Sequence, residues 1–105
     1  MTTTNYYSIL TNVGLSKVAS ALSSNTTIQI TEMALGDGNG NEVTPNATQT
    51  SLVNQVYRAS LNQLISDPNN NAHVIAEMVV PTDQGPFTIR EIGLYDNEDD
   101  LIAVA

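Results

Sequence analysis

The sequence predicts an α+β domain in which an antiparallel or mixed β-sheet packs against one or two short helices. Three observations predict this class: one stretch of helical apolar spacing, several short runs typical of strands, and turn signals between them. A chain of 105 residues with 41% hydrophobic side chains is long enough for one core and too short for two. We therefore treat residues 1–105 as a single domain.

The helical stretch lies close to the N-terminus. Thr11 or Asn12 can cap it, because their side-chain oxygens accept hydrogen bonds from the free N–H groups of the first turn. The apolar residues that follow at helical spacing are Leu15, Val18, Ala19 and Leu22. This spacing predicts an amphipathic helix over 12–24 whose apolar face is covered by the sheet. Before it, the run at 6–10 predicts a first strand or an extended arm.

Strand signals begin directly after the helix. Residues 26–31 alternate with period two, the phase breaks at Glu32 and Met33, and the strand ends at Gly36. Such a break predicts a bulge or a change of face. The stretch 52–65 fits either a helix or a strand preceded by one turn, and periodicity leaves both open.

The second half of the chain predicts paired strands. A turn at 67–71, rich in Asn and Pro, separates two elements that should pair, the second of them a strand over 73–80. A further strand is predicted over 87–95, with Gly93 as a bulge or close-approach point. The turn at 96–100 then leads to a return strand at 101–105.

A long Gly- and Asn-rich loop spans 36–50. Loops of this length are uncommon in compact domains and are usually functional or mobile, so we take this one as a candidate contact surface. Asp37, Asn39 and Asn41 alternate along it and offer oxygen ligands suited to calcium. The glycine and glutamate that an EF-hand needs are missing, since Glu42 and Thr48 occupy those positions. The spacing therefore predicts no metal site.

Charge and composition exclude several functions. The formal net charge is −8, and the only cations are Lys17, Arg58 and Arg90. Such a field repels nucleic-acid phosphates and anionic membrane surfaces. Cysteine is absent, which removes disulfides and thiolate chemistry. With neither a secretory signal nor an apolar run of membrane-spanning length, the sequence predicts folding in the cytoplasm and no membrane insertion.

No catalytic or cofactor-binding constellation is predicted. His73 is the only histidine, so no zinc site or histidine dyad can form. A glycosidase would need two carboxylates across a cleft, and Glu77 and Glu91 lie on predicted neighbouring strands. Solvent exposure of Glu77 and charged pairing of Glu91 within a sheet or interface explain the two residues better. The acidic run 96–100 is expected to be a solvated turn or to meet a basic patch on a partner.

Five separated blocks carry a family resemblance. They are 10–15, 30–38, 56–58, 87–96 and 101–105, and the fourth contains the run Ile92-Gly93-Leu94-Tyr95-Asp96. In this order they resemble the N-terminal domain of phage tail-fibre (tail-collar fibre) proteins. The family's turn before the last strand usually contains glycine where this chain has residues 97–100. The family's domain also normally continues beyond Ala105, so we expect this domain to be truncated at its C-terminal end.

The resemblance implies a structural virion module that attaches a trimeric fibre to the baseplate of a contractile tail in a phage or phage-derived particle. A receptor- or carbohydrate-binding tail protein and a polysaccharide-degrading tail enzyme are the alternatives. Arg58 and Arg90 lie in the family-like blocks as ion-pair residues or as interface anchors. The residues expected to contact a partner are Asp37, Asn39, Asn41, Arg58, Arg90, Glu91 and Tyr95.

Overall fold

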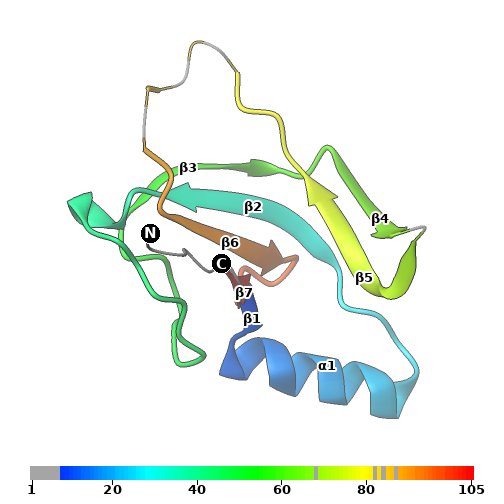
Figure 1. Cartoon of the computed structure of the whole chain (residues 1–105). Coiled ribbons are helices and arrows are strands. Elements are labelled where there is room, and N and C mark those ends of the chain that lie inside the picture. The colour runs from blue at the N-terminus through cyan, green and yellow to red at the C-terminus, as the bar shows by residue number, and fades with distance from the viewer. Residues whose placement is uncertain (1–7, 68, 82, 84, 87) are drawn as a thin grey trace.

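The computed structural model describes residues 8–67, 69–81, 83, 85–86 and 88–105. The elements in chain order are β1 (Ile9–Leu10), α1 (Asn12–Ser24), β2 (Ile30–Gly36), the 3-10 turn η1 (Gly38–Gly40), β3 (Gln55–Ser60), β4 (Gln63–Asp67), β5 (Asn70–Glu77), β6 (Glu91–Asp96) and β7 (Leu101–Val104). Five strands form one sheet in the order β1-β7-β6-β2-β3, and β4 and β5 form a second sheet of two strands (Figure 1). Every pairing is antiparallel. The α+β class is confirmed, and the sheet is antiparallel rather than mixed.

The bounds predicted for the helix are confirmed, and Thr11 is its cap. The Thr11 hydroxyl accepts a hydrogen bond from the Gly14 N–H at 2.9 Å and donates to the Leu101 carbonyl at 2.6 Å. The Thr11 side chain is fully buried. At the other end Asn25 takes a left-handed conformation, with φ of 55°, and closes the last turn. One threonine therefore starts α1 and joins it to β7.

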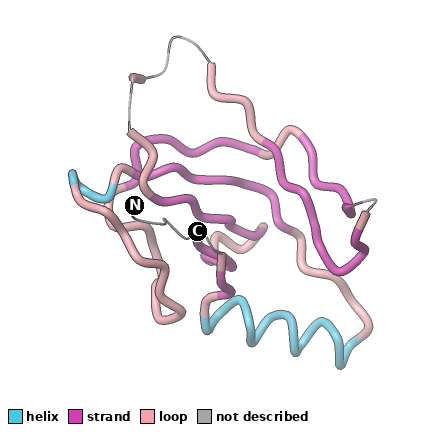
Figure 2. The backbone as a smooth tube through the Cα atoms, in the orientation of Figure 1, coloured by secondary structure: helices cyan, strands magenta, loops and turns pink. Residues whose placement is uncertain are grey.

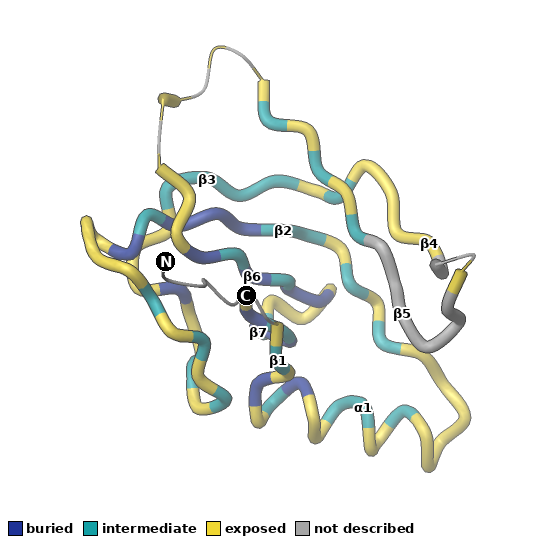
Figure 3. Tube along the Cα trace, in the orientation of Figure 1, coloured by how far each residue is buried: buried dark blue, intermediate teal, exposed yellow. Residues whose placement is uncertain are grey.

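The predicted covering of the helix face by the sheet is wrong. Leu15 is 58% exposed and Leu22 is 78% exposed, and the only buried residue of α1 is Gly14. The reason is the place of the helix, which meets β7 and β1 at the border of the sheet and does not lie across a sheet face (Figure 1). Its later turns therefore extend away from the core (Figure 3).

The ambiguous stretch 52–65 is extended. It contains β3 and the start of β4, and the turn after β4 joins it to β5 as predicted. The strand predicted over 73–80 begins earlier and ends at Glu77, since the Val79 N–H donates to the Asn62 side chain instead of to a strand. The strand predicted over 87–95 begins only at Glu91, because Gly36, where β2 ends, is its last partner there.

Leu35 is buried on one face of the five-stranded sheet, and the main hydrophobic cluster lies on the opposite face. Its buried residues are Ala34, Leu52, Tyr95, Leu101 and Val104, with Ile9 packed against them. Leu52 comes from the segment before β3, so this loop covers that face. Gly93 is a close-approach point as predicted, because a Cβ there would lie 2.8 Å from Leu101 Cδ1 and 3.1 Å from Leu52 Cδ2. The register shifts of β2 lie just before Glu32 and at Gly36.

The β4–β5 hairpin stands apart from this core. It lies at one side of the molecule and continues from the end of β3 (Figure 2). Leu64 and Ile65 of β4 are exposed. A two-stranded hairpin is only marginally stable by itself in water. We therefore expect this hairpin to be the least protected part of the described fold in hydrogen exchange.

Candidate functional site

Most of the residues expected to bind a partner gather where β2 ends and β6 begins. Asp37 follows β2 and caps η1, accepting hydrogen bonds from the Asn39 N–H at 2.9 Å and from the Asn54 amide at 2.8 Å. These hydrogen bonds, the one from Asn54 first, hold the pKa of Asp37 below its usual value. Asn39 takes a left-handed conformation, with φ of 56°, and is exposed, as is Asn41. The loop tip is therefore ordered by Asp37 and presents two amide side chains.

Glu91, at the start of β6, holds this loop in place. Its side chain is buried, with the residue only 2% exposed, and its carboxylate accepts three backbone hydrogen bonds. The donors are Val53 at 2.8 Å, Asn54 at 2.8 Å and Gly38 at 3.2 Å. Charge-assisted bonds of this kind are stronger than neutral ones. One carboxylate thus ties both ends of the long loop to β6.

The glycine at 36 makes room for this carboxylate. A Cβ at Gly36 would lie 2.5 Å from both Cγ and Oε2 of Glu91. Gly36, in the family-like block 30–38, therefore lies at the place where β2 passes the buried side chain. The sequence predicts Glu91 in a charged pair or an interface, whereas its partners are backbone N–H groups from a loop about 40 residues away along the chain.

Arg90 is the exposed cation of this end of the molecule. Its guanidinium donates to the Asp37 carbonyl at 3.0 Å, and among the described residues it forms no ion pair. Its stem lies 3.5 Å from the place that a Cβ on Gly38 would take. A guanidinium has five N–H donors in a fixed planar fork, so most of this one stays available to a carboxylate of a partner.

Arg58 and Tyr95 form a separate cluster on the core face. The Arg58 guanidinium lies 3.8 Å above the centre of the Tyr95 ring and donates to Glu32 at 2.8 Å and 3.1 Å. It also donates to the Asp99 carboxylate. Tyr95 is buried, and burial raises the pKa of its phenol. Both residues therefore join β2, β3, β6 and the last turn within the domain.

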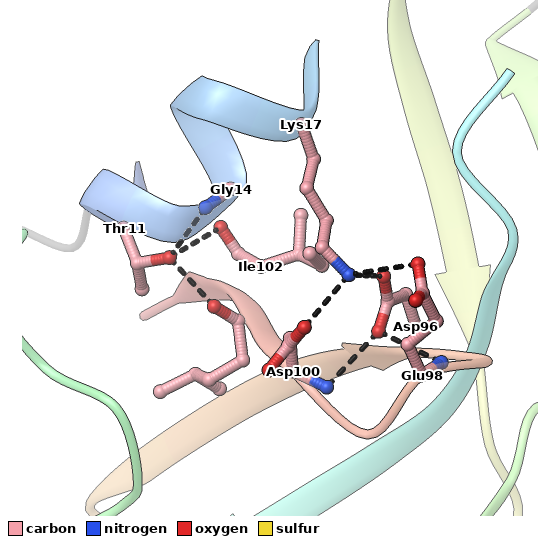
Figure 4. A network of polar contacts seen from close by, with 8 residues as sticks. Thr11, Gly14, Lys17, Asp96, Glu98, Asp100 and Ile102 are labelled. Atoms are coloured by element: carbon pink, nitrogen blue, oxygen red, sulfur yellow. Dashed lines mark hydrogen bonds and ion pairs between the residues drawn. The ribbon is translucent and has the colours of Figure 1, made fainter. Parts of the chain in front are cut away.

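The acidic turn at 96–100 is tied to the helix by Lys17 (Figure 4). The Lys17 ammonium lies 2.5 Å from the buried Asp96, 2.7 Å from Asp100 and 3.3 Å from Glu98. Oδ1 of Asp96 also accepts the N–H groups of Glu98 and Asp100. This turn is therefore partly neutralised from within the chain. Asp99 completes it with a left-handed φ of 66°, a conformation in which glycine is unstrained.

The Lys17 cluster predicts a specific loss of stability in acid. Burial opposes the ionisation of Asp96, but Lys17 and the two N–H groups still hold its pKa below the usual value. A carboxyl group whose pKa is lower in the folded state stabilises the fold at pH values above its unfolded pKa of about 3.9. This stabilisation disappears as the pH falls through the pKa of the folded state. Lys17→Met should therefore reduce the acid dependence of the free energy of unfolding, measured with urea at neutral and acid pH.

The charge-conserving variant Lys17→Arg is the control for that experiment and should keep most of the acid dependence. The pKa of Lys17 itself is raised, by Asp100 first and then by Asp96. The contribution of Lys17 to the free energy of unfolding is therefore complete at pH values below the unfolded lysine pKa of about 10.4, and it is lost only in strong base. Equal acid dependence in wild type and Lys17→Met would contradict the assignment.

The structure separates the two carboxylates considered for catalysis. Glu77 and Glu91 were expected on neighbouring strands, but β5 pairs with β4 whereas β6 pairs with β2 and β7. Glu77 is exposed on the hairpin, and Glu91 is engaged by backbone N–H groups. His73 lies in β5, and its side chain is outside the described part of the structure.

Among the described residues, no three His, Cys, Asp or Glu side chains are grouped closely enough to hold a metal ion. No helix in this part of the chain is long and apolar enough to cross a membrane. The described fold is an antiparallel sheet whose loops and turns are held by side-chain hydrogen bonds and ion pairs.

These features define a structural module with exposed, ordered loops. The model of the family "Phage tail-collar fibre protein, N-terminal" matches residues 2–105, so the chain belongs to this family and is a structural module of a phage tail fibre. The chain is 42% identical over 101 residues to a "Probable tail fiber protein" of Escherichia phage P2. This match covers 95% of the chain and 15% of the P2 protein's length. No solved structure matches the chain.

Proposed function

We propose that this module is the root of a tail fibre and attaches the fibre to a baseplate protein of a contractile tail, without catalysing a reaction. The observation that carries the proposal is the loop end at Asp37, which presents exposed polar groups on a support fixed by the buried Glu91. A fixed support lowers the entropy that is lost on binding. In the full fibre we propose a homotrimer that assembles in the host cytoplasm and ends in the virion tail.

The contact residues follow from exposure within the predicted set. Asn39, Asn41 and Arg90 are exposed, whereas Glu91 and Tyr95 are buried and act on the partner only through the loop and the sheet. Asp37 and Arg58 are engaged within the domain. Arg90 is the strongest candidate for an energetically dominant contact, because arginine is over-represented among such residues.

The test is a binding titration of the domain against the tail proteins encoded beside it. We expect a stoichiometric complex with a baseplate protein and a loss of affinity of about tenfold or more in Arg90→Ala. Arg90→Lys keeps the charge and loses the planar guanidinium, so its affinity should lie between those of the wild type and Arg90→Ala. Asn97→Ala, an exposed substitution in the β6–β7 turn, is the matched control and should bind as wild type does.

Two results would contradict this function. Binding to cell-surface glycans together with no tail partner would indicate a receptor-binding protein. Release of sugars from a host polysaccharide, lost in Glu77→Gln, would indicate an enzyme. A complex that forms equally well with Arg90→Ala would keep the attachment but remove Arg90 from the contact surface.

A further inference from the structure

The exposed turn η1 contains the one Asn-Gly pair of the sequence. Among all the asparagines of the chain, Asn39 alone is followed by glycine. Because glycine has no side chain, the backbone nitrogen of Gly40 is unshielded and can approach the side-chain amide before it. Both residues are exposed, and a Cβ placed on Gly40 would meet nothing within 4 Å. Neither burial nor crowding therefore protects this pair from reaction with water.

The reaction open to such a pair is deamidation, and water is its only co-reactant. The Gly40 nitrogen loses its proton and bonds to Cγ of Asn39, the bond from Cγ to Nδ2 breaks, and the amide nitrogen leaves as ammonia. Water then opens the cyclic imide. Cleavage of the new bond gives aspartate, whereas cleavage of the original peptide bond gives isoaspartate, whose main chain runs through Cγ and is longer. Either product adds a negative charge.

The conformation of Asn39 keeps the reacting atoms apart. Asn39 has a φ of 56° and a ψ of 38°, the left-handed conformation that asparagine tolerates better than most residues. At this ψ the Gly40 nitrogen lies anti to the Asn39 Cβ about the bond from Cα to the carbonyl carbon. The imide ring requires these two atoms to be eclipsed about that bond, because both belong to the ring. The ψ of Asn39 must therefore turn through most of a half-rotation before ring closure.

Hydrogen bonds to Asp37 hold this conformation in place. The Gly40 N–H donates to the Asp37 carbonyl at 3.2 Å, so the attacking nitrogen is itself engaged. The Asn39 N–H donates to the Asp37 carboxylate at 2.9 Å. The same carboxylate oxygen accepts the Asn54 side-chain amide at 2.8 Å, which fixes Asp37 to the segment before β3. Asn39 can therefore reach the reactive conformation only after the loop has opened at Asp37.

We infer that Asn39 and Gly40 form a deamidation site that the folded loop keeps unreactive and that reacts when the loop opens locally. Local opening of a surface loop requires less free energy than global unfolding, so the site reacts slowly while the domain stays native. Reaction puts a carboxylate, and in isoaspartate a longer main chain, at the loop end. The resulting loss of baseplate contact rests on the proposed function, whereas the reaction itself does not.

The experiment compares the deamidation rate of the native 105-residue chain with that of the same chain unfolded in urea, at one mildly alkaline pH. Trypsin releases residues 18–58 as one peptide, since Lys17 and Arg58 are consecutive basic residues of the sequence, and fragmentation in the mass spectrometer locates the changed residue. The native rate at Asn39 should be lower by about tenfold or more, because the hydrogen bonds at Asp37 must open first. Equal rates would overturn the inference, as would the absence of reaction at Asn39 in urea.

Two controls show that the pair itself reacts. Asn25 lies in the same tryptic peptide and has a similar left-handed conformation, with φ of 55°, but threonine follows it. Asn25 should keep its amide in the native chain and in urea over the time in which Asn39 reacts. In Asn39→Gln the imide ring would need another atom and closes much more slowly, so the rapid mass change should disappear.

Variants of Asp37 test whether the loop controls the rate. Asp37→Ala removes the carboxylate that Asn39 and Asn54 share, and it should raise the native rate about fivefold or more without changing the rate in urea. Asp37→Ser keeps a side-chain oxygen that can cap the turn and should stay close to the wild type. An unchanged native rate in an Asp37→Ala variant that circular dichroism shows folded would contradict the inference. If this variant does not fold, the wild-type comparison still decides.

Baseplate binding of aged protein distinguishes this inference from the proposed function. The domain is stored in its native state until part of Asn39 has reacted, and its fractions are titrated with the baseplate protein found in the binding experiment above. The isoaspartate fraction should bind more weakly than fresh protein, whereas stored Asn39→Gln should bind as fresh Asn39→Gln does. Full binding by the isoaspartate fraction would overturn the inferred effect on the loop. The expected rates without any baseplate partner would contradict the proposed function and support the reaction site.

Discussion

Replacing Glu91 by alanine is expected to lower the free energy of unfolding by about 3 kcal/mol, because three backbone N–H groups lose a charged acceptor at a buried site. Glu91→Gln should cost nearly as much, since its NH₂ group would face N–H donors and could not accept from them. The total free energy of unfolding of a domain of this size is about 5–15 kcal/mol. Urea unfolding followed by circular dichroism measures the change directly.

The control for this prediction is Glu42→Gln, which neutralises an exposed glutamate in the same long loop and should change stability by at most about 0.5 kcal/mol. If Glu91→Ala cost no more than the control, the carboxylate would not be the support of the loop. Baseplate binding offers a second measurement. Glu91→Gln should weaken it even where the variant stays folded, since the loop end at Asp37 would lose its support.

Replacing Gly14 by alanine is expected to destabilise the domain by about 2 kcal/mol or more, although alanine is normally the better helix former by about 1 kcal/mol. A Cβ at this position would lie 2.1 Å from the carbonyl oxygen of Ile102 and 2.9 Å from its carbonyl carbon. Both are backbone atoms of β7, which cannot move aside as a flexible side chain can. The first turn of α1 would have to separate from the sheet.

Ser20→Ala is the matched control, because it makes a change to alanine at an exposed position of the same helix and should be neutral or slightly stabilising. Thermal unfolding of the two variants beside the wild type should therefore give shifts of opposite sign, or a shift for Gly14→Ala alone. A stabilised Gly14→Ala variant would mean that helix propensity dominates and that α1 does not lie as close to β7 as the structure has it.

Both predictions concern contacts that hold the proposed attachment loop and the helix to one sheet. Glu91 connects β6 to the loop end at Asp37, and Thr11 and Gly14 connect α1 to β7. Lys17 adds a third connection between the helix and the β6–β7 turn. In the proposed role as a fibre root, the module would transmit force between the fibre and its support, and cross-connections between elements far apart in sequence would suit that role.

The sequence by itself determined the features that depend on neighbouring residues. The cap at Thr11 and the left-handed Asn25 set the ends of α1, and the turn after Asp67 sets the β4–β5 hairpin, because their signals act within a few residues. The separated blocks of family-like sequence also predicted the family, which the comparison over 2–105 confirmed. The α+β class followed from the same local patterns.

Only the tertiary structure decided which apolar surface is covered and which charged residue is buried. The helical spacing of Leu15 and Leu22 indicated a covered face, but the contact of Gly14 with Ile102 places the helix at the border of the sheet. Glu91 was expected in a charged pair or an interface, because its three backbone donors lie 37 or more positions away along the chain. Local pattern gives each strand its two faces, but long-range pairing decides what each face meets.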